Sequence, residues 1–283
     1  MVGVAKYFGQ YKPEENRFYK ISRSKIESFI NCKRCFYLDR KLKIAQPPGF
    51  PFNLNSAVDN LLKNEFDEYR KKQKPHPYIK EIGLDAVPFQ HPNIDEWREN
   101  FKGVSFDHHK FKFHLFGAVD DLWINNKTDE LIVVDYKSTS KKDEITLDAE
   151  WQDGYKRQME FYQYLLRKNG FKVSNDGYFV YCNGIKEGKF KNSLNFNVKL
   201  IKYTGNDNWV ESTLSEVHSI LNQEIVPSIN QDCQFCSYQE KIKSITETTQ
   251  EDQESNLNFC TICCEQKLID LEGLCPDCGN SLI

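Results

Sequence analysis

The hydrophobic positions of this chain follow two different spacings, and each spacing predicts a different kind of element. Apolar residues recur every three or four positions in residues 54–71 and 148–168, which is typical of amphipathic helices with one buried face. Short apolar runs bounded by turn residues instead predict strands. The order of these elements predicts an α/β fold, a mixed sheet flanked by helices, with strands at 111–124, 131–134, 177–182 and 195–203 and a further helix at 208–225.

The strand at 131–134 ends in a polar triplet, Asp135-Tyr136-Lys137. Because side chains alternate between the two faces of a strand, Asp135 and Lys137 point to one face and Tyr136 to the other. An acid and a lysine at this spacing usually form no more than a solvated surface pair. Here they follow four consecutive apolar residues, which favours a central strand and a functional pair.

A second acid precedes this strand. Asp120 lies in the same predicted strand as Gly117, three residues after it, and close backbone approach or a bulge is expected at that glycine. The turn at 125–129 favours a hairpin, which would bring Asp120 and Asp135 within reach of one ion. The neighbouring Asp121 points to the opposite side of the strand. Two carboxylates and an amine on one face suit a hard divalent cation and a hydrolytic reaction.

These residues belong to an ordered set of motifs, Gly117-x-x-Asp120, Asp135-Tyr136-Lys137 and Gln158-x-x-x-Tyr162. The set resembles the RecB-like branch of the PD-(D/E)XK nuclease superfamily, which includes the nuclease domains of AddB and RecB and the CRISPR-associated RecB-like exonucleases. The resemblance covers residues 20–240. It implies a restriction-endonuclease-like core and a Mg²⁺- or Mn²⁺-dependent deoxyribonuclease, acting on DNA ends or single strands in a pathway such as DNA repair.

The resemblance also implies a role for each motif residue. Asp120 and Asp135 would bind Mg²⁺ or Mn²⁺, with the backbone carbonyl of Tyr136 as a further ligand. Lys137 would orient the attacking water or stabilise charge on the phosphate. A metal-held water has a lowered pKa, and an ammonium group adds a compact positive charge, so the roles are chemically consistent. Gln158 and Tyr162 would contact the nucleic-acid backbone and help to hold the active site.

Asp59 is a further candidate ligand, on the predicted helix at 54–71. Members of the RecB-like branch usually carry a histidine on this first helix, in a motif that resembles G-x-x-x-H. This chain offers an aspartate instead and lacks the glycine. A third carboxylate would tighten the binding of Mg²⁺, whereas the alternative is a solvated acid at the helix boundary.

Ten cysteines in a chain without a predicted membrane span or signal peptide favour metal binding in the cytoplasm over disulfides. One group consists of two C-x-x-C pairs, far apart in the sequence. Iron–sulfur members of the RecB-like branch use one early and three late cysteines, whereas this chain has two of each. The resemblance implies a [4Fe–4S] cluster, and Zn²⁺ stays an alternative, for Cys32, Cys35, Cys233 and Cys236.

A second cysteine group has the spacing C-x2-C-x11-C-x2-C, which predicts a zinc ribbon formed by Cys260, Cys263, Cys275 and Cys278. Cys264 could replace Cys263. Zinc would supply most of the folding energy of so short a segment. The predicted organisation is a nuclease domain at 1–242, a flexible linker at 243–256 and the ribbon at 257–283. We expect a protein partner to bind the ribbon.

A formal net charge of −3 excludes binding to DNA by bulk electrostatics, so binding needs local basic surface, with candidates at 20–43, 137–142 and 186–202. Two other functions stay open. The chain could be a nucleic-acid-binding adaptor that keeps the nuclease fold without catalysis. It could also be an endonuclease whose sequence specificity comes from the ribbon.

Overall fold

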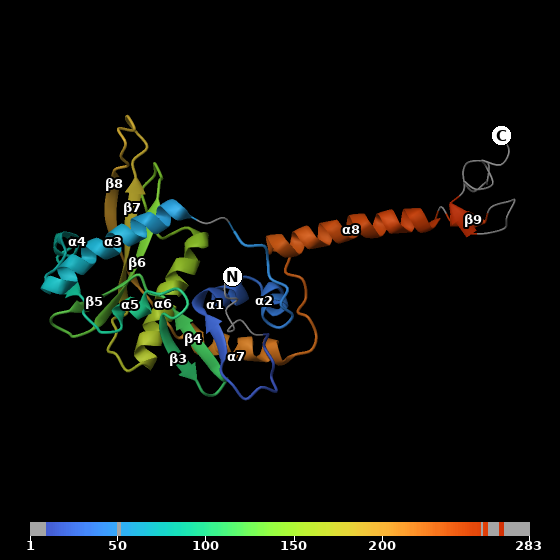
Figure 1. Ribbon diagram of the computed structural model, residues 1–283, viewed down its shortest axis with the longest axis horizontal. Helices are drawn as coiled ribbons and strands as arrows, with labels where there is room; N and C mark the ends of the chain where they lie inside the picture. The colour runs from blue at the N-terminus through green and yellow to red at the C-terminus, as the bar shows by residue number, and fades with distance from the viewer. Residues whose placement is uncertain (1–9, 50–51, 256, 260–265, 269–283) are drawn as a thin grey trace, which may run out of the picture. The chain divides into compact units, whose positions relative to one another are not determined.

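The computed structural model describes residues 10–49, 52–255, 257–259 and 266–268, with side chains up to residue 246. Contacts within the chain divide it into two units, Met1–Pro227 and Ser228–Ile283. The predicted α/β class is confirmed in the first unit, where a mixed sheet is flanked by helices (Figure 1). The zinc-ribbon cysteines at 260, 263, 275 and 278 lie outside the described residues.

A five-stranded sheet forms the centre of the first unit, in the order β2-β5-β6-β7-β8. Neighbouring strands are antiparallel except for β6 and β7, which run parallel. The predicted hairpin between Asp120 and Asp135 is confirmed, because β5 and β6 pair antiparallel across a tight turn. The strands are β2 (Ala86–Pro88), β5 (Asp121–Asn125), β6 (Leu131–Thr139), β7 (Asp176–Gly184) and β8 (Phe196–Thr204).

A smaller sheet has the order β1-β4-β3 and contains β1 (Tyr19–Ser22), β3 (Val104–His108) and β4 (Phe113–Gly117). The single strand predicted at 111–124 is therefore wrong. The chain leaves the small sheet after Gly117 and enters the central sheet at Asp121. The intervening bend is fixed by the Val119 N–H, which donates to the Trp97 carbonyl at 3.1 Å. Asp120 lies in this bend, at the junction of the two sheets.

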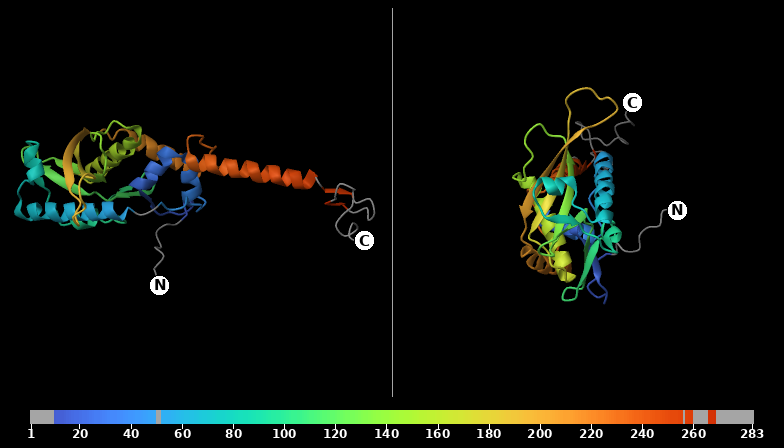
Figure 2. Two further views of the ribbon diagram at one scale, coloured as in Figure 1. Left: turned by 90° about the horizontal axis from the view of Figure 1, so that it is seen from above. Right: turned by 90° about the vertical axis from the view of Figure 1, so that its left-hand side faces the viewer.

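Helices cover both faces of the central sheet, as the side-chain alternation along β6 requires (Figure 2). Ile132, Val134 and Tyr136 pack with the buried face of α3 (Asn53–Lys72). Leu131 and Val133 instead belong to the core formed with α6 (Asp153–Lys168) and α7 (Trp209–Asn222). The remaining helices of this unit are α1 (Arg23–Asn31), α2 (Lys33–Arg40), α4 (Pro77–Glu81), α5 (Ile94–Trp97) and the 3₁₀ turn η1 (Glu150–Gln152).

The second unit contains α8 (Gln234–Ser255) and a hairpin of β9 (Leu257–Phe259) and β10 (Gln266–Leu268). The residues expected to form a flexible linker are helical as far as Ser255. No proline or glycine interrupts 234–255, and its Glu, Gln and Lys residues favour a helix. Among the helices that the structure describes, none combines the length and the apolar character needed to cross a bilayer.

Candidate active site

Asp135 lies near the end of the central sheet and is fully buried, with an exposed fraction of 0%. It forms an ion pair with Lys137, two residues along β6, as the strand alternation predicts. Asp135 Oδ2 contacts the Lys137 ammonium group, whereas Asp135 Oδ1 has no hydrogen-bond partner among the described residues. A buried carboxylate without hydrogen bonds is costly unless a proton or a cation completes its surroundings.

The charges around this pair shift both pKa values. Burial raises the pKa of Asp135 to about 7, Lys137 opposes this increase, and the charge of Asp120 adds to it. Burial lowers the pKa of Lys137, but Asp135 and Asp120 outweigh the loss of solvation, so the net shift is upward. Lys137 is therefore a permanent cation at neutral pH, beside an acid that titrates near neutrality.

Asp120 reaches the same region from the bend before β5. The backbone N–H of Tyr136 donates to Asp120 Oδ2 at 2.9 Å, and this bond ties the bend to β6. Lys63 Nζ on α3 lies 3.8 Å from Asp120 Oδ1. The hairpin register explains the approach, because Asp121 pairs with Val134 and Asp120 is the next residue outward, opposite Asp135. The structure thus brings Asp120 and Asp135 together.

Asp59 contributes a third carboxylate from α3. Lys63 Nζ donates to Asp59 Oδ2 at 2.8 Å, whereas Asp59 Oδ1 is buried and has no hydrogen-bond partner in the described part of the chain. Burial and then the charge of Asp120 raise the pKa of Asp59, so the two acids are close neighbours electrostatically. The helix places this acid beside the sheet residues and not on a solvated boundary.

A cleft of about 410 Å³ is lined by Asp59, Asp120 and Lys137, and the buried Asp135 contacts the cleft residue Lys137. Sequence reasoning missed one cationic side chain of the cleft, Arg23, whose charge lowers the pKa of Asp135. Arg23 begins α1, so nothing in its local sequence indicated a place beside β6. Polar groups that line the cleft are Arg23, Asn55, Ser56, Asp59, Asn100, Asp120, Tyr136, Lys137, Ser138, Tyr155 and Gln158.

The two α6 residues of the third motif occupy different depths. Gln158 lines the cleft, and its Nε2 donates to the Tyr162 hydroxyl at 3.2 Å. Tyr162 is only 4% exposed and lies behind Gln158, where its ring packs on Gly117. A Cβ atom at Gly117 would lie 2.5 Å from Tyr162 Cε1, so the close approach predicted at this glycine is confirmed. In this arrangement Gln158 faces the cleft, and the Tyr162 hydroxyl accepts its hydrogen bond.

An ionic network supports the site from the opposite face of the hairpin. Asp121 is fully buried and pairs with Arg70 of α3 and with Arg98, whose Nη2 lies 2.9 Å away. The Tyr136 hydroxyl donates to Asp121 Oδ2 at 2.9 Å. Asp121 and Tyr136 are the immediate neighbours of Asp120 and Asp135 in the sequence. The network therefore links α3, β5 and β6 directly beneath the three acids.

The donor atoms of the cleft suit a hard divalent cation. Asp59, Asp120 and Asp135 offer carboxylate oxygens, the ligand type that Mg²⁺ and Mn²⁺ prefer. Two of these acids keep buried oxygens that no described hydrogen-bond donor satisfies, namely Asp59 and Asp135. A cation would satisfy those oxygens and offset the mutual repulsion of the acids. The residues present therefore fit such an ion.

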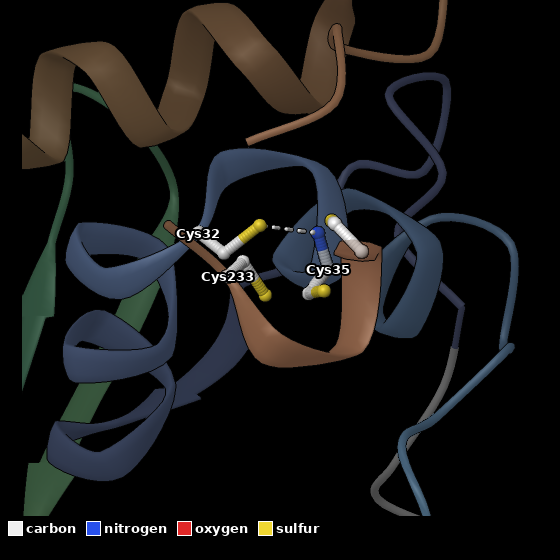
Figure 3. Close-up of side chains that lie close together, drawn as sticks. Cys32, Cys35 and Cys233 are labelled. Atoms are coloured by element: carbon white, nitrogen blue, oxygen red, sulfur yellow. Dashed lines mark hydrogen bonds between the residues drawn. The ribbon is translucent and has the colours of Figure 1, made fainter. Parts of the chain in front are cut away.

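The structure also brings together the first cysteine group, from two distant parts of the chain. The Sγ atoms of Cys32, Cys35, Cys233 and Cys236 all lie within 4.8 Å of one another. Figure 3 shows Cys32, at the N-cap of α2, whose Sγ accepts a hydrogen bond from the Cys35 N–H at 3.4 Å. Four converging thiols can bind a metal, and both Zn²⁺ and iron–sulfur clusters accept four thiolates.

Comparison with known proteins identifies the family of the chain. The family model of the PD-(D/E)XK nuclease superfamily matches residues 47–240, which include Asp59, the hairpin acids and Lys137. The chain belongs to the PD-(D/E)XK nuclease superfamily. A solved structure described as "Crystal structure of SSO0001" is similar over 76% of this chain and 80% of its own length, with 13% identity and a TM-score of 0.36. No curated protein matches the chain.

Proposed function

We propose that this protein is a metal-dependent nuclease that hydrolyses DNA phosphodiester bonds at ends or in single strands. The observation that carries the proposal is the convergence of Asp59, Asp120, Asp135 and Lys137 at one cleft, in a member of a nuclease superfamily. The paired early and late cysteines support a place in the RecB-like branch.

The three carboxylates would hold Mg²⁺ or Mn²⁺. When bound, such a cation supplies a water of lowered pKa and neutralises charge that develops on the phosphate. Lys137 is fixed between its contact with Asp135 and the ring of Tyr155, whose centroid lies 4.5 Å from Nζ. From there its ammonium group donates to the attacking water or to a phosphate oxygen. Arg23 and Gln158 donate to the substrate backbone from the cleft wall.

Cys32, Cys35, Cys233 and Cys236 would hold a [4Fe–4S] cluster, with Zn²⁺ as the alternative occupant. The proposal extends to a zinc ribbon at 257–283 with Cys260, Cys263, Cys275 and Cys278 as ligands, and to a protein partner bound there. Thiolate ligands require a reducing compartment, which supports a cytoplasmic location.

Nuclease activity is tested with purified protein, Mg²⁺ or Mn²⁺, and labelled single-stranded DNA, duplex DNA and RNA. We expect single-stranded DNA to be cut, and Asp135→Ala or Lys137→Ala to abolish cutting. Asp95→Asn and Lys127→Ala change exposed residues of the same charge types and serve as matched controls. Unchanged cutting by both site variants would refute the site. DNA binding by the wild-type protein without cleavage under either metal would favour the adaptor function.

A further inference from the structure

The cleft continues into a second, smaller pocket, most of whose lining residues have no role in the proposed reaction. This pocket has a volume of about 50 Å³ and shares Lys137, Ser138 and Tyr155 with the active-site cleft. Its outer rim carries Trp151 and Lys141. The shared residues make the pocket a direct extension of the site.

Trp151 is unusually exposed for its size, at 57% of its surface. Its ring lies 5.5 Å from that of Tyr155, centroid to centroid, at an interplanar angle of 84°. Tyr155 and the ammonium group of Lys141, which lies over the ring, contact part of the indole, and more than half of the side chain stays exposed. Tyr155 in turn lies under the ammonium group of Lys137, so a single ring separates Trp151 from a catalytic group.

The backbone that carries Trp151 is held firmly, although the side chain is exposed. Its neighbour Gln152 is buried, and Gln152 Nε2 donates to the Thr146 carbonyl at 2.7 Å and to the Tyr181 hydroxyl at 3.3 Å. The Ala149 N–H donates to Gln152 Oε1 at 3.0 Å. The exposed ring therefore projects from a fixed turn, and a ligand that stacks on it needs to order little of the chain.

Lys141 is held in the same way at its backbone. Its N–H donates to Asn183 Oδ1 at 2.8 Å, and its carbonyl accepts from Asn183 Nδ2 at 2.9 Å. Its side-chain Nζ lies 4.8 Å from the centroid of the Trp151 ring. Two nearby acids are already paired, Glu144 with Lys199 and Asp153 with Lys156, at 2.7 and 2.9 Å. The rim thus offers an aromatic face beside a solvated cation.

We propose that Trp151 and Lys141 form a nucleotide subsite beside the active site. An unpaired base of a single-stranded nucleic acid stacks on the indole, and the adjoining phosphate pairs with the Lys141 ammonium group. Stacking on an aromatic face tolerates any base but requires one that is not already stacked and paired in a duplex. The inference rests on the proposed nuclease function and deepens it, because it assigns the preference for single strands to this rim.

The test measures binding, so that it does not depend on cleavage. Wild-type protein is titrated with a ten-nucleotide oligothymidylate and with a duplex of equal length, with Ca²⁺ in place of Mg²⁺, and the DNA is checked for integrity afterwards. We expect Trp151→Ala to weaken single-strand binding about tenfold and to leave duplex binding unchanged. Trp151→Phe keeps an aromatic face and should restore most of the affinity.

Two further readouts separate stacking from a loss of structure. Intrinsic tryptophan fluorescence should be quenched by the oligothymidylate in the wild type and not in Trp151→Phe, because Trp97 and Trp123 are buried and the half-buried Trp209 is held by a hydrogen bond to Glu160. Phe190→Ala removes another exposed aromatic, 77% exposed, from a different loop and should change neither affinity nor the melting temperature.

The failure of the subsite is distinguishable from the failure of the nuclease function. Unchanged oligothymidylate affinity in Trp151→Ala, with wild-type cleavage intact, overturns the subsite alone. Equal losses for single strand and duplex also overturn it, because stacking on an unpaired base would not affect a duplex. A wild-type protein that neither binds nor cuts any of these nucleic acids overturns the proposed function and the subsite together.

Discussion

Asp135 combines complete burial with a single ion-pair partner and a second acid nearby. Its pKa is raised to about 7, first by burial, with the charge of Asp120 as a further cause. A cation bound by this carboxylate takes the place of its proton. At the residue scale, metal binding and protonation at Asp135 therefore compete.

This competition predicts the pH dependence of metal binding. We expect the Mn²⁺ affinity of the protein to rise as the pH approaches about 7 and to level off above it, with about a tenfold loss per unit below. Titration calorimetry at pH 6, 7 and 8 measures this. Asp135→Asn cannot titrate, so it should lose most of the affinity together with the pH dependence. A wild-type affinity that is constant across this range would contradict the prediction.

Gly117 leaves no room for a side chain beside the ring of Tyr162. In Gly117→Ala the new methyl group would lie 2.5 Å from the Tyr162 ring, so the ring must move and Gln158 moves with it. We expect a destabilisation of about 1–3 kcal/mol, as for overpacking in a core, together with reduced cleavage. Gly184→Ala is the matched control, because its nearest contacts would be at 3.6 Å, an ordinary packing distance. Denaturant unfolding of both variants measures the difference.

The sequence predicted which residues of β6 share a face, but not which side chains from other elements approach them. The period of two placed Asp135 and Lys137 on one face because alternation is a local property of a strand. Arg23 was not predictable, since its approach to β6 depends on the packing of α1, more than 100 residues earlier in the chain. Long-range packing of this kind leaves no pattern around either residue.

At the element scale, Asp121 joins the helix that carries one acid to the strands that carry the others. Its carboxylate is shared between Arg70, Arg98 and the Tyr136 hydroxyl, and it is fully buried. The network fixes α3 against the β5–β6 hairpin, on the face of the hairpin that α3 covers. The spacing of Asp59 from Asp120 therefore depends on an acid outside the proposed ligand set.

Removing this charge tests the network. Asp121→Asn leaves two buried guanidinium groups without their shared carboxylate, and we expect a loss of about 3–5 kcal/mol in the free energy of unfolding. Asp176→Asn is the control, because Asp176 pairs with Lys202 on the surface at 2.7 Å, and exposed pairs contribute about 0–1 kcal/mol. Urea unfolding measures both variants. Equal small losses in the two variants would show that the network does not hold the elements together.

The elements themselves were largely predictable from periodicity. The helices expected at 54–71 and 208–225 are observed as α3 and α7, within three residues at each end. The stretch at 111–124 was wrongly predicted as one strand because apolar residues occur on both sides of Asp120, where the chain changes sheets. A change of partner strand is a tertiary event, and Gly117 was its only local sign.

At the scale of the whole molecule, residues at the two ends of the nuclease region gather at one metal-binding group. Cys32 and Cys35 precede the 47–240 match to the superfamily, whereas Cys233 and Cys236 lie at its end. The two cysteine pairs are too far apart in the sequence for their spacing to predict one shared site. Only the resemblance to iron–sulfur nucleases predicted it. A bound metal would close the long loop between the two cysteine pairs and so restrict the unfolded chain strongly. We therefore expect the metal to stabilise the folded protein.

The identity of this metal is the last prediction, and it decides the branch of the superfamily. We expect anaerobically purified protein to be brown, with visible absorption and about four irons per chain, as a [4Fe–4S] cluster requires. Cys236→Ser should lose the colour and lower the melting temperature, whereas Ser237→Ala, at the next position of α8, should do neither. A colourless protein with about two zinc ions per chain, one of them for the proposed ribbon, would instead assign Zn²⁺ to this group. That result would remove the support for the RecB-like branch and leave the carboxylate site unaffected, because the two sites share no ligand.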